Sequence, residues 1–137
     1  MKKAIDITRI SAQRTSDRRI EFTMLQRAML GALLGQQTGG KVSGYIGRPA
    51  TEEDMHALYS ALRKVRLSAD EVAPFLQSFG VEKRLDLARI GAKEETQTIT
   101  LDGGEARVLR AFLSGWLRAD GALADRDWAE GILQACD

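Results

Sequence analysis

The sequence has few of the residues on which cysteine and histidine chemistry depends. Among its 137 residues there is one cysteine, Cys136, and one histidine, His56. One thiol cannot form a disulfide within the chain, which is typical of proteins from a reducing compartment. One cysteine and one histidine are also too few ligands for a structural zinc site, so we expect no bound metal.

Long hydrophobic runs are missing as well. No window approaches the roughly 20 apolar residues that a membrane-spanning helix needs. The chain begins Met-Lys-Lys, as some signal peptides do, but acidic residues and arginines appear before any apolar run develops. We therefore expect a cytoplasmic protein without membrane contact.

Neither sign of charge is in clear excess. Lysine and arginine total 20 against 19 aspartates and glutamates, so no strong global field attracts a polyanion or a membrane surface. Hydrophobic residues make up 44% of the chain, a fraction typical of folded globular proteins. The length is that of one domain, and we expect residues 1–137 to form a single one.

Capping signals predict most of the helices. The capping-box pattern, an N-cap residue followed three positions later by Glu or Gln, occurs at Thr23–Gln26, Ser68–Glu71 and Asp102–Glu105. Thr51, followed by three acidic residues, marks another start, and a weaker last helix is expected from about Asp125. The helix after Ser68 is expected to end at Gly80 and to be kinked or split by Pro74.

Strand signals are fewer. Residues 96–101 are rich in β-branched side chains, and residues 19–23 and 4–10 are further candidates. Together these elements predict an α+β fold, with about five helices packed on a small, mostly antiparallel sheet.

An internal similarity suggests that a β-α unit is used twice. Residues 6–12 align with 86–92, residues 20–23 with 99–102, and residues 28–34 with 107–113. We therefore expect two pseudo-repeated units, at about 6–37 and 86–117, with a helical insertion at about 51–80. The alternative is that any two segments built of a strand, a cap and a helix share this pattern.

Signals for catalysis are weak. Residues 35–41 resemble the first seven positions of a phosphate-binding loop, but Val42 replaces the hydroxyl residue that binds magnesium, and the stretch follows a helix instead of a strand. Nothing places a serine and an acid near His56, and the acidic residues of 120–130 have the wrong spacing for a calcium loop. We expect no cofactor and no enzyme activity.

The glycine-rich segment 35–50 is longer than most helix connections and is predicted as a loop. It carries Lys41, Tyr45, Ile46 and Arg48, an exposed set of cations and apolar side chains of the kind that protein interfaces use. These four residues are the predicted partner-binding site of a non-catalytic protein-binding module. A homodimer is a further possibility, because the last helix has an apolar face.

The basic N-terminal segment supports an alternative. Arg14, Arg18 and Arg19 lie in a polar stretch with hydroxyl and amide side chains, a combination that can contact phosphates. In this interpretation the protein is a nucleic-acid-binding regulator.

Residues 67–87 resemble a tail seen in several phage-borne accessory proteins. The shared features are a helix that starts at Ser68, then Gly80-Val81, and then Leu85-x-Leu87. The resemblance covers a small part of the chain and transfers no residue role. It implies a phage or mobile-element origin, and we expect the protein-binding module to act there as an accessory, inhibitor or assembly factor.

Overall fold

The computed structural model describes residues 17–121 and 126–136. The strand predicted at 4–10, the first segment of the proposed repeat and Arg14 all lie outside these ranges. The single domain expected for the whole chain therefore stays a prediction.

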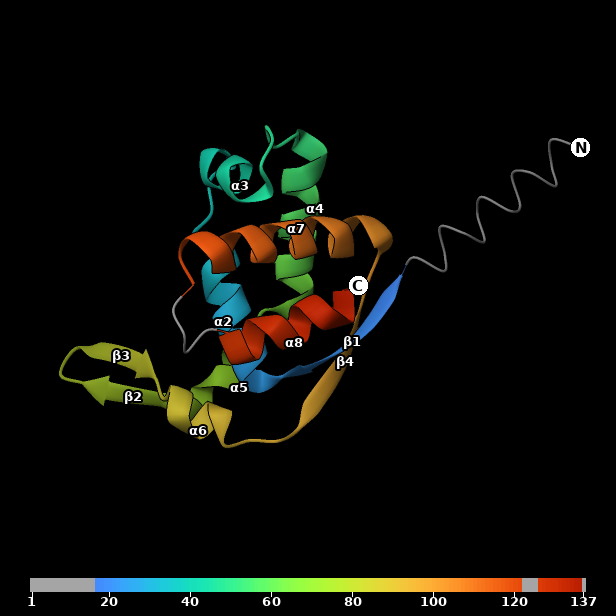
Figure 1. The fold of residues 1–137 in the computed structure, drawn as a ribbon. Helices are drawn as coiled ribbons and strands as arrows, with labels where there is room; N and C mark the ends of the chain where they lie inside the picture. Colours follow the sequence, from blue (N-terminus) through green and yellow to red (C-terminus); the bar gives the residue numbers. More distant parts are fainter. Residues whose placement is uncertain (1–16, 122–125, 137) are drawn as a thin grey trace, which may run out of the picture.

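The described residues form an α+β fold, as predicted (Figure 1). They contain two antiparallel two-stranded sheets, β1 with β4 and β2 with β3, and seven α-helices instead of about five. In chain order the elements are β1 (Arg18–Thr23), α2 (Met24–Gly35), α3 (Gly39–Ile46), α4 (Glu52–Val65), α5 (Ala69–Val72), a 3₁₀ turn η1 (Ala73–Phe75), β2 (Leu76–Phe79), β3 (Glu82–Leu85), α6 (Leu87–Gly91), β4 (Thr96–Leu101), α7 (Gly103–Ala119) and α8 (Arg126–Cys136).

The predicted capping boxes are confirmed. The N-cap side chains of Thr23, Ser68 and Asp102 each accept a hydrogen bond from the backbone three residues on, and the Gln or Glu there accepts one from the N-cap backbone. Thr51 makes the same reciprocal arrangement with Asp54 at the start of α4. These contacts satisfy amide groups that a helix leaves unbonded at its first turn.

The hydrophobic core lies between the β1–β4 sheet and the long helices. Ile20 and Ile99 are register partners, and they are buried together with Phe22 and Leu101 on the same face of the sheet. Helix α7 packs against α3, α4 and α8, so it is the central helix of the body (Figure 1). Trp116 of α7 and Trp128 of α8 have ring centroids 5.6 Å apart, so Trp128 packs across the fold against the central helix.

Two sequence predictions of local structure are wrong. Segment 35–50 is not a long loop, because residues 39–46 form helix α3, with Thr38 as its N-cap and Gly47 in the left-handed region after it. The helix after Ser68 also does not continue to Gly80. The helix, α5, ends at Val72, because Pro74 has no amide proton to continue it. Strand β2 then begins at Leu76 and pairs with β3.

The structure does not confirm the internal repeat. Strands β1 and β4 pair with each other and each leads into a helix with a capping box, as the alignment requires. However, residues 86–92 contain helix α6, and the segment aligned with them lies outside the described residues. The insertion at 51–80 is not wholly helical either, since it includes β2.

A buried arginine joins the body to the segment that carries the β2–β3 hairpin. Arg27 of α2 is 7% exposed. Its guanidinium group donates to the carbonyl oxygens of Val65 and Arg66 at the end of α4, at 2.9 and 3.2 Å. It also forms two bonds with the Glu71 carboxylate, at 2.7 and 3.1 Å. Glu71 belongs to α5, which η1 connects directly to β2, so this contact fixes the root of the hairpin.

The contact with Arg27 predicts a specific loss of stability in acid. The hydrogen bonds from Arg27 hold the pKa of Glu71 at about 2, below its ordinary value of 4.5. Because the folded-state pKa is depressed, this stabilisation is complete above pH 4.5 and is lost as the pH falls towards about 2. Glu71→Gln keeps the capping box but removes the charge.

We expect Glu71→Gln to lower the free energy of unfolding at neutral pH by about 2 kcal/mol, less than for a fully buried pair because the Glu71 side chain is 37% exposed. The difference from the wild type should shrink to near zero towards pH 2. Urea titrations of both proteins across this pH range measure it. A difference that does not change with pH would show that the ion pair does not stabilise the fold.

Candidate functional site

The four predicted partner-binding residues lie on or next to α3. Three of them, Tyr45, Ile46 and Arg48, make contacts within the fold. Lys41 is exposed, and its side chain makes no ion pair with any described residue. Ile46 is half-buried against the core. Arg48 forms two bonds with Asp54, at 2.5 and 3.0 Å, although its own side chain is 53% exposed. This pairing holds the pKa of the Asp54 carboxyl well below its usual range and anchors the start of α4.

Tyr45 is held in place by α7. Its ring packs edge-on against Phe112, with centroids 5.3 Å apart. Its hydroxyl group donates a hydrogen bond to Asp120, which raises the pKa of the tyrosine. The backbone of Tyr45 also lies against Gly115, where an added Cβ would come within 1.8 Å of the Tyr45 carbonyl oxygen. Tyr45 therefore belongs to a packed interface between α3 and α7, and not to the loop that the sequence suggested.

The N-terminal arginines do not form a described cluster. Arg14 lies outside the described residues, and Arg18 and Arg19 are neighbours on strand β1. Successive side chains of a strand point to opposite faces, so these two cannot contact one phosphate together. Arg18 is half-buried and donates to the Asp17 carbonyl oxygen, whereas Arg19 is exposed.

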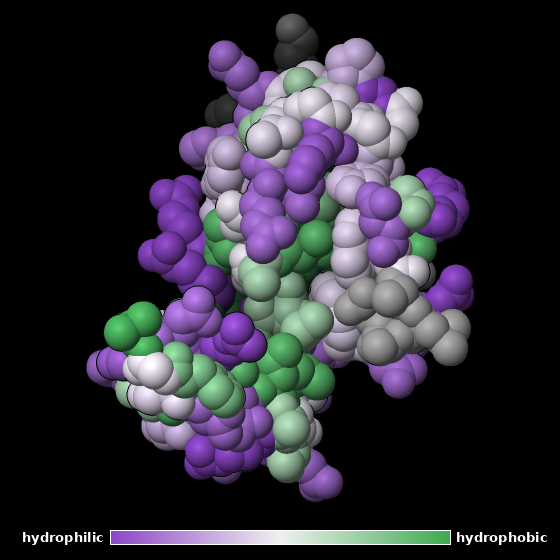
Figure 2. Space-filling model, turned by 90° about the vertical axis from the view of Figure 1, so that its left-hand side faces the viewer, coloured by the Kyte–Doolittle hydropathy of each residue, from purple (hydrophilic) through white to green (hydrophobic). Residues whose placement is uncertain are grey.

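The β2–β3 hairpin is the most exposed apolar feature among the described residues, and the sequence reasoning missed it. Every residue of both strands is exposed. Phe79 is 55% exposed, and Val81 at the tip is fully so. The hairpin projects from the body (Figure 1), and hydrophobic side chains lie on it and at its base (Figure 2). Leu76, Leu85 and Leu87 near the root are 37–43% exposed.

A turn signal could have revealed this hairpin. The loop between the strands is Gly80-Val81, and Gly80 has a φ of +66°. A two-residue loop whose first residue alone has positive φ has the features of a type II′ turn, the kind that favours hairpins. The sequence reasoning assigned Gly80 to the end of a helix instead, because a glycine C-cap has the same local appearance.

An apolar groove opens at the root of the hairpin. It has a volume of about 260 Å³ and lies between the small side chains of α2, the α4–α5 connection and Leu85 of β3. Its apolar lining consists of Ala28, Gly31, Ala32, Leu67, Val72 and Leu85. The exposed hairpin and this groove form one continuous surface, because Leu85 belongs to both.

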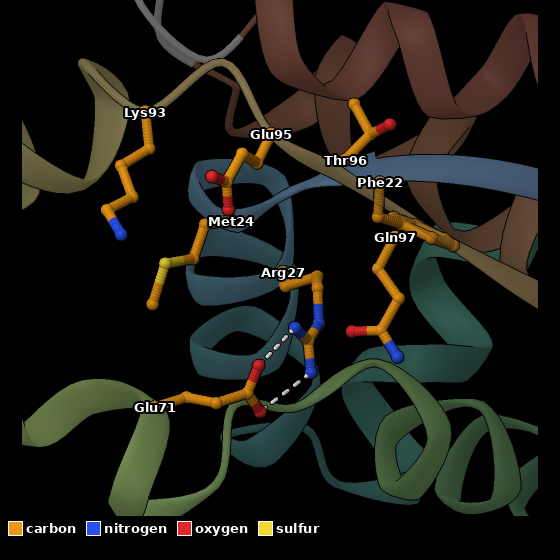
Figure 3. Close-up of a pocket in the computed structure, with 8 residues that line it drawn as sticks. All are labelled: Phe22, Met24, Arg27, Glu71, Lys93, Glu95, Thr96 and Gln97. Atoms are coloured by element: carbon orange, nitrogen blue, oxygen red, sulfur yellow. Dashed lines mark hydrogen bonds and ion pairs between the residues drawn. The ribbon is translucent and has the colours of Figure 1, made fainter.

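A second hollow also has Arg27 in its wall (Figure 3). It measures about 320 Å³ and is lined by residues of β1, α2, α5, β4 and the α6–β4 connection. The Arg27 and Glu71 side chains in its wall point towards each other and are paired. Lys93 and Glu95 contribute one charge of each sign, so no single ligand charge is favoured.

The described residues offer little for catalysis or metal binding. His56 is exposed on α4. In residues 17–121 and 126–136, no group of three or more His, Cys, Asp or Glu side chains is placed to hold a metal ion. Within the same ranges, no helix combines the length and apolar character needed to cross a membrane.

The close contact at Gly115 predicts a large effect of a single methyl group. Gly115→Ala should force α3 away from α7 and lower the free energy of unfolding by about 3 kcal/mol, the upper end of ordinary overpacking costs. Gly44→Ala is the matched control, because a Cβ there meets nothing within 4 Å. It should stabilise α3 by about 0.5–1 kcal/mol. Thermal and urea unfolding measure both, and equal effects would mean that α3 is not packed on α7.

Comparison with known proteins gives no family for this chain. No protein-family model, curated protein or solved structure matches it significantly. Among the described residues, the exposed hairpin is the surface whose geometry best fits a binding role.

Proposed function

We propose that this chain is a non-catalytic protein-binding module whose main contact surface is the β2–β3 hairpin. The observation that carries the proposal is the exposure of Leu76, Phe79, Val81 and Leu85 on an element that adds nothing to the core of the body. An accessory, inhibitor or assembly role for a phage or mobile element remains a finer form of the same proposal.

The energetics support a partner at this surface. A two-stranded hairpin is marginally stable in water without further strands or a covering helix. Contiguous exposed apolar side chains are a common mark of protein interaction sites. Burying Phe79 and Val81 against a partner would therefore improve both the solvation and the order of the hairpin.

The charges of the hairpin favour a protein over a nucleic acid. Glu82 pairs with Arg84 at 3.1 Å, and the Arg84 guanidinium lies 5.6 Å from the centre of the Phe79 ring. A phosphate-binding surface needs free positive charge, whereas on the two strands themselves Arg84 is paired with an acid and β2 carries no charge. A mixed apolar and charged surface resembles the rim and centre of protein interfaces.

The earlier candidates occupy a secondary place in this proposal. Lys41 and Arg48 remain accessible at the edge of α3, where they can contribute charge to a wide interface. Tyr45 and Ile46 stabilise the fold, so their replacement would mix unfolding with loss of binding. A test of binding must therefore use the hairpin.

Site-specific photo-crosslinking in the native host tests the proposal. A photoreactive phenylalanine analogue at position 79 should give an adduct of defined mass. The same analogue at Tyr59, which is 48% exposed on α4, is the matched control and should give little. Equal labelling at both positions would contradict a hairpin interface.

A pair of serine substitutions gives the quantitative arm of this test. Val81→Ser combined with Leu76→Ser should weaken the complex by about 2–4 kcal/mol, the usual cost of losing interface anchors. The free energy of unfolding should change by less than about 1 kcal/mol, because neither side chain is buried in the body. Titration calorimetry with the crosslinked partner, once identified, measures the first quantity, and urea unfolding measures the second.

A further inference from the structure

We propose that the hairpin pairs with a second copy of this chain, through antiparallel contact of the two β2 strands. The product is a four-stranded sheet in the order β3-β2-β2-β3, related by a two-fold axis. This inference rests on the proposed function, because it names the partner that the same hairpin contacts.

The main chain of β2 has its unpaired groups directed away from β3. The Asp86 amide donates to the Phe75 carbonyl oxygen at 2.7 Å, immediately before the strand pairs begin. In an antiparallel ladder the bonded positions alternate along each strand. Phe75, Gln77 and Phe79 therefore direct their main-chain groups towards β3, and Leu76 and Ser78 direct theirs outwards.

The two edges of the hairpin differ in charge. Strand β2 reads Leu-Gln-Ser-Phe and has no charged side chain, whereas β3 reads Glu-Lys-Arg-Leu. Proteins protect exposed strand edges with charged residues, lysine above all. Strand β3 has that protection and β2 lacks it, so β2 is the edge that is open to strand addition.

The sequence of β2 is compatible with its own copy. Directly opposite residues of antiparallel strands face the same side of the sheet. A two-fold axis perpendicular to the sheet must therefore place one residue of β2 opposite its own copy, and the axis is named by that residue. An axis through Gln77 places Leu76 opposite Ser78 of the copy, and an axis through Ser78 places Gln77 opposite Phe79. Neither register brings like charges together, and both bring Leu76 of the two copies onto one face.

The charges at the two ends of the hairpin are complementary in this arrangement. Antiparallel pairing places the tip of one hairpin beside the root of the other. The root carries Arg89 and Lys93, whose charged groups lie 5.5 and 5.4 Å from the centre of the Phe75 ring. The tip carries Glu82, the register partner of Phe79, which places these two side chains on one face of the hairpin. The acid at the tip of each copy, which pairs with Arg84 of its own strand, would therefore lie towards the end of the hairpin where the other copy carries Arg89 and Lys93.

Two proline variants test the pairing with a matched control. Ser78→Pro removes an outward amide from the β2 edge, and Lys83→Pro removes one from the β3 edge, because Ser78 and Lys83 are register partners. Proline is tolerated on a strand whose amide faces solvent, so neither change disrupts the bonds between β2 and β3. Circular dichroism and urea unfolding confirm that both variants keep the fold.

Sedimentation equilibrium of the full chain over a wide range of concentration gives the result. We expect the wild type and Lys83→Pro to dimerise with dissociation constants within about twofold of each other. Ser78→Pro should raise the constant by about tenfold or more, because both copies lose a main-chain hydrogen bond. A monomeric wild type, or equal effects of the two prolines, would overturn the inference.

The crosslinking experiment separates this inference from the proposed function. An adduct at position 79 with twice the mass of the chain supports pairing of two copies. A monomeric protein that forms an adduct with a different polypeptide refutes the pairing and leaves the protein-binding function intact. A monomeric protein with no adduct at position 79 contradicts both proposals.

Discussion

The hydrogen bonds of the buried Arg27 side chain determine how α5 and the following hairpin are attached to the body. Helix α4 ends at Val65, where carbonyl oxygens would remain unbonded, and the guanidinium group bonds those of Val65 and Arg66. The same group holds Glu71 in two-point contact and so fixes α5. One planar fork thus joins three helices, a geometry that the single ammonium group of lysine cannot reproduce. Without it, α5 would lose its side-chain bonds to the body, and the root of the hairpin would depend on the buried Phe75 and on the packing of α6 against α2.

This anchor divides the molecule into two parts with different physical roles. The body is stabilised by the burial of apolar side chains around α7, including Phe112 and Leu113, which are fully buried. The buried Glu105 adds a polar contact there: burial raises its pKa, but hydrogen bonds from Lys64, Ser60 and the Asp102 backbone outweigh this and lower it overall. The hairpin has no comparable core. Its shape is set by a tight turn at one end and by the Arg27 contact at the other.

The sequence predicted those elements whose signals are local. The capping boxes at Thr23, Ser68 and Asp102 located three helix starts, and the β-branched run at 96–101 located β4, because each signal involves residues a few positions apart. The hairpin and α3 were missed for the opposite reason. Gly80 serves equally as a helix stop or a hairpin turn, and only pairing with β3 decides between them. Helix α3, with three glycines in eight residues, forms because Gly115 of a distant helix lets it pack closely.

The exposed edge of β2 is a constraint of a different kind from those that stabilise the body. In a chain with 28% charged residues, four adjacent exposed positions carry no charge, and two of them are large and apolar. Folding does not require this composition, since a lysine or glutamate at any of these positions would meet solvent and protect the edge. The neighbouring strand has that protection, which shows that the hairpin tolerates charge. The uncharged edge is the feature on which the proposed strand pairing rests, and the contact of Arg27 with Glu71 would hold that edge in a fixed position on the body.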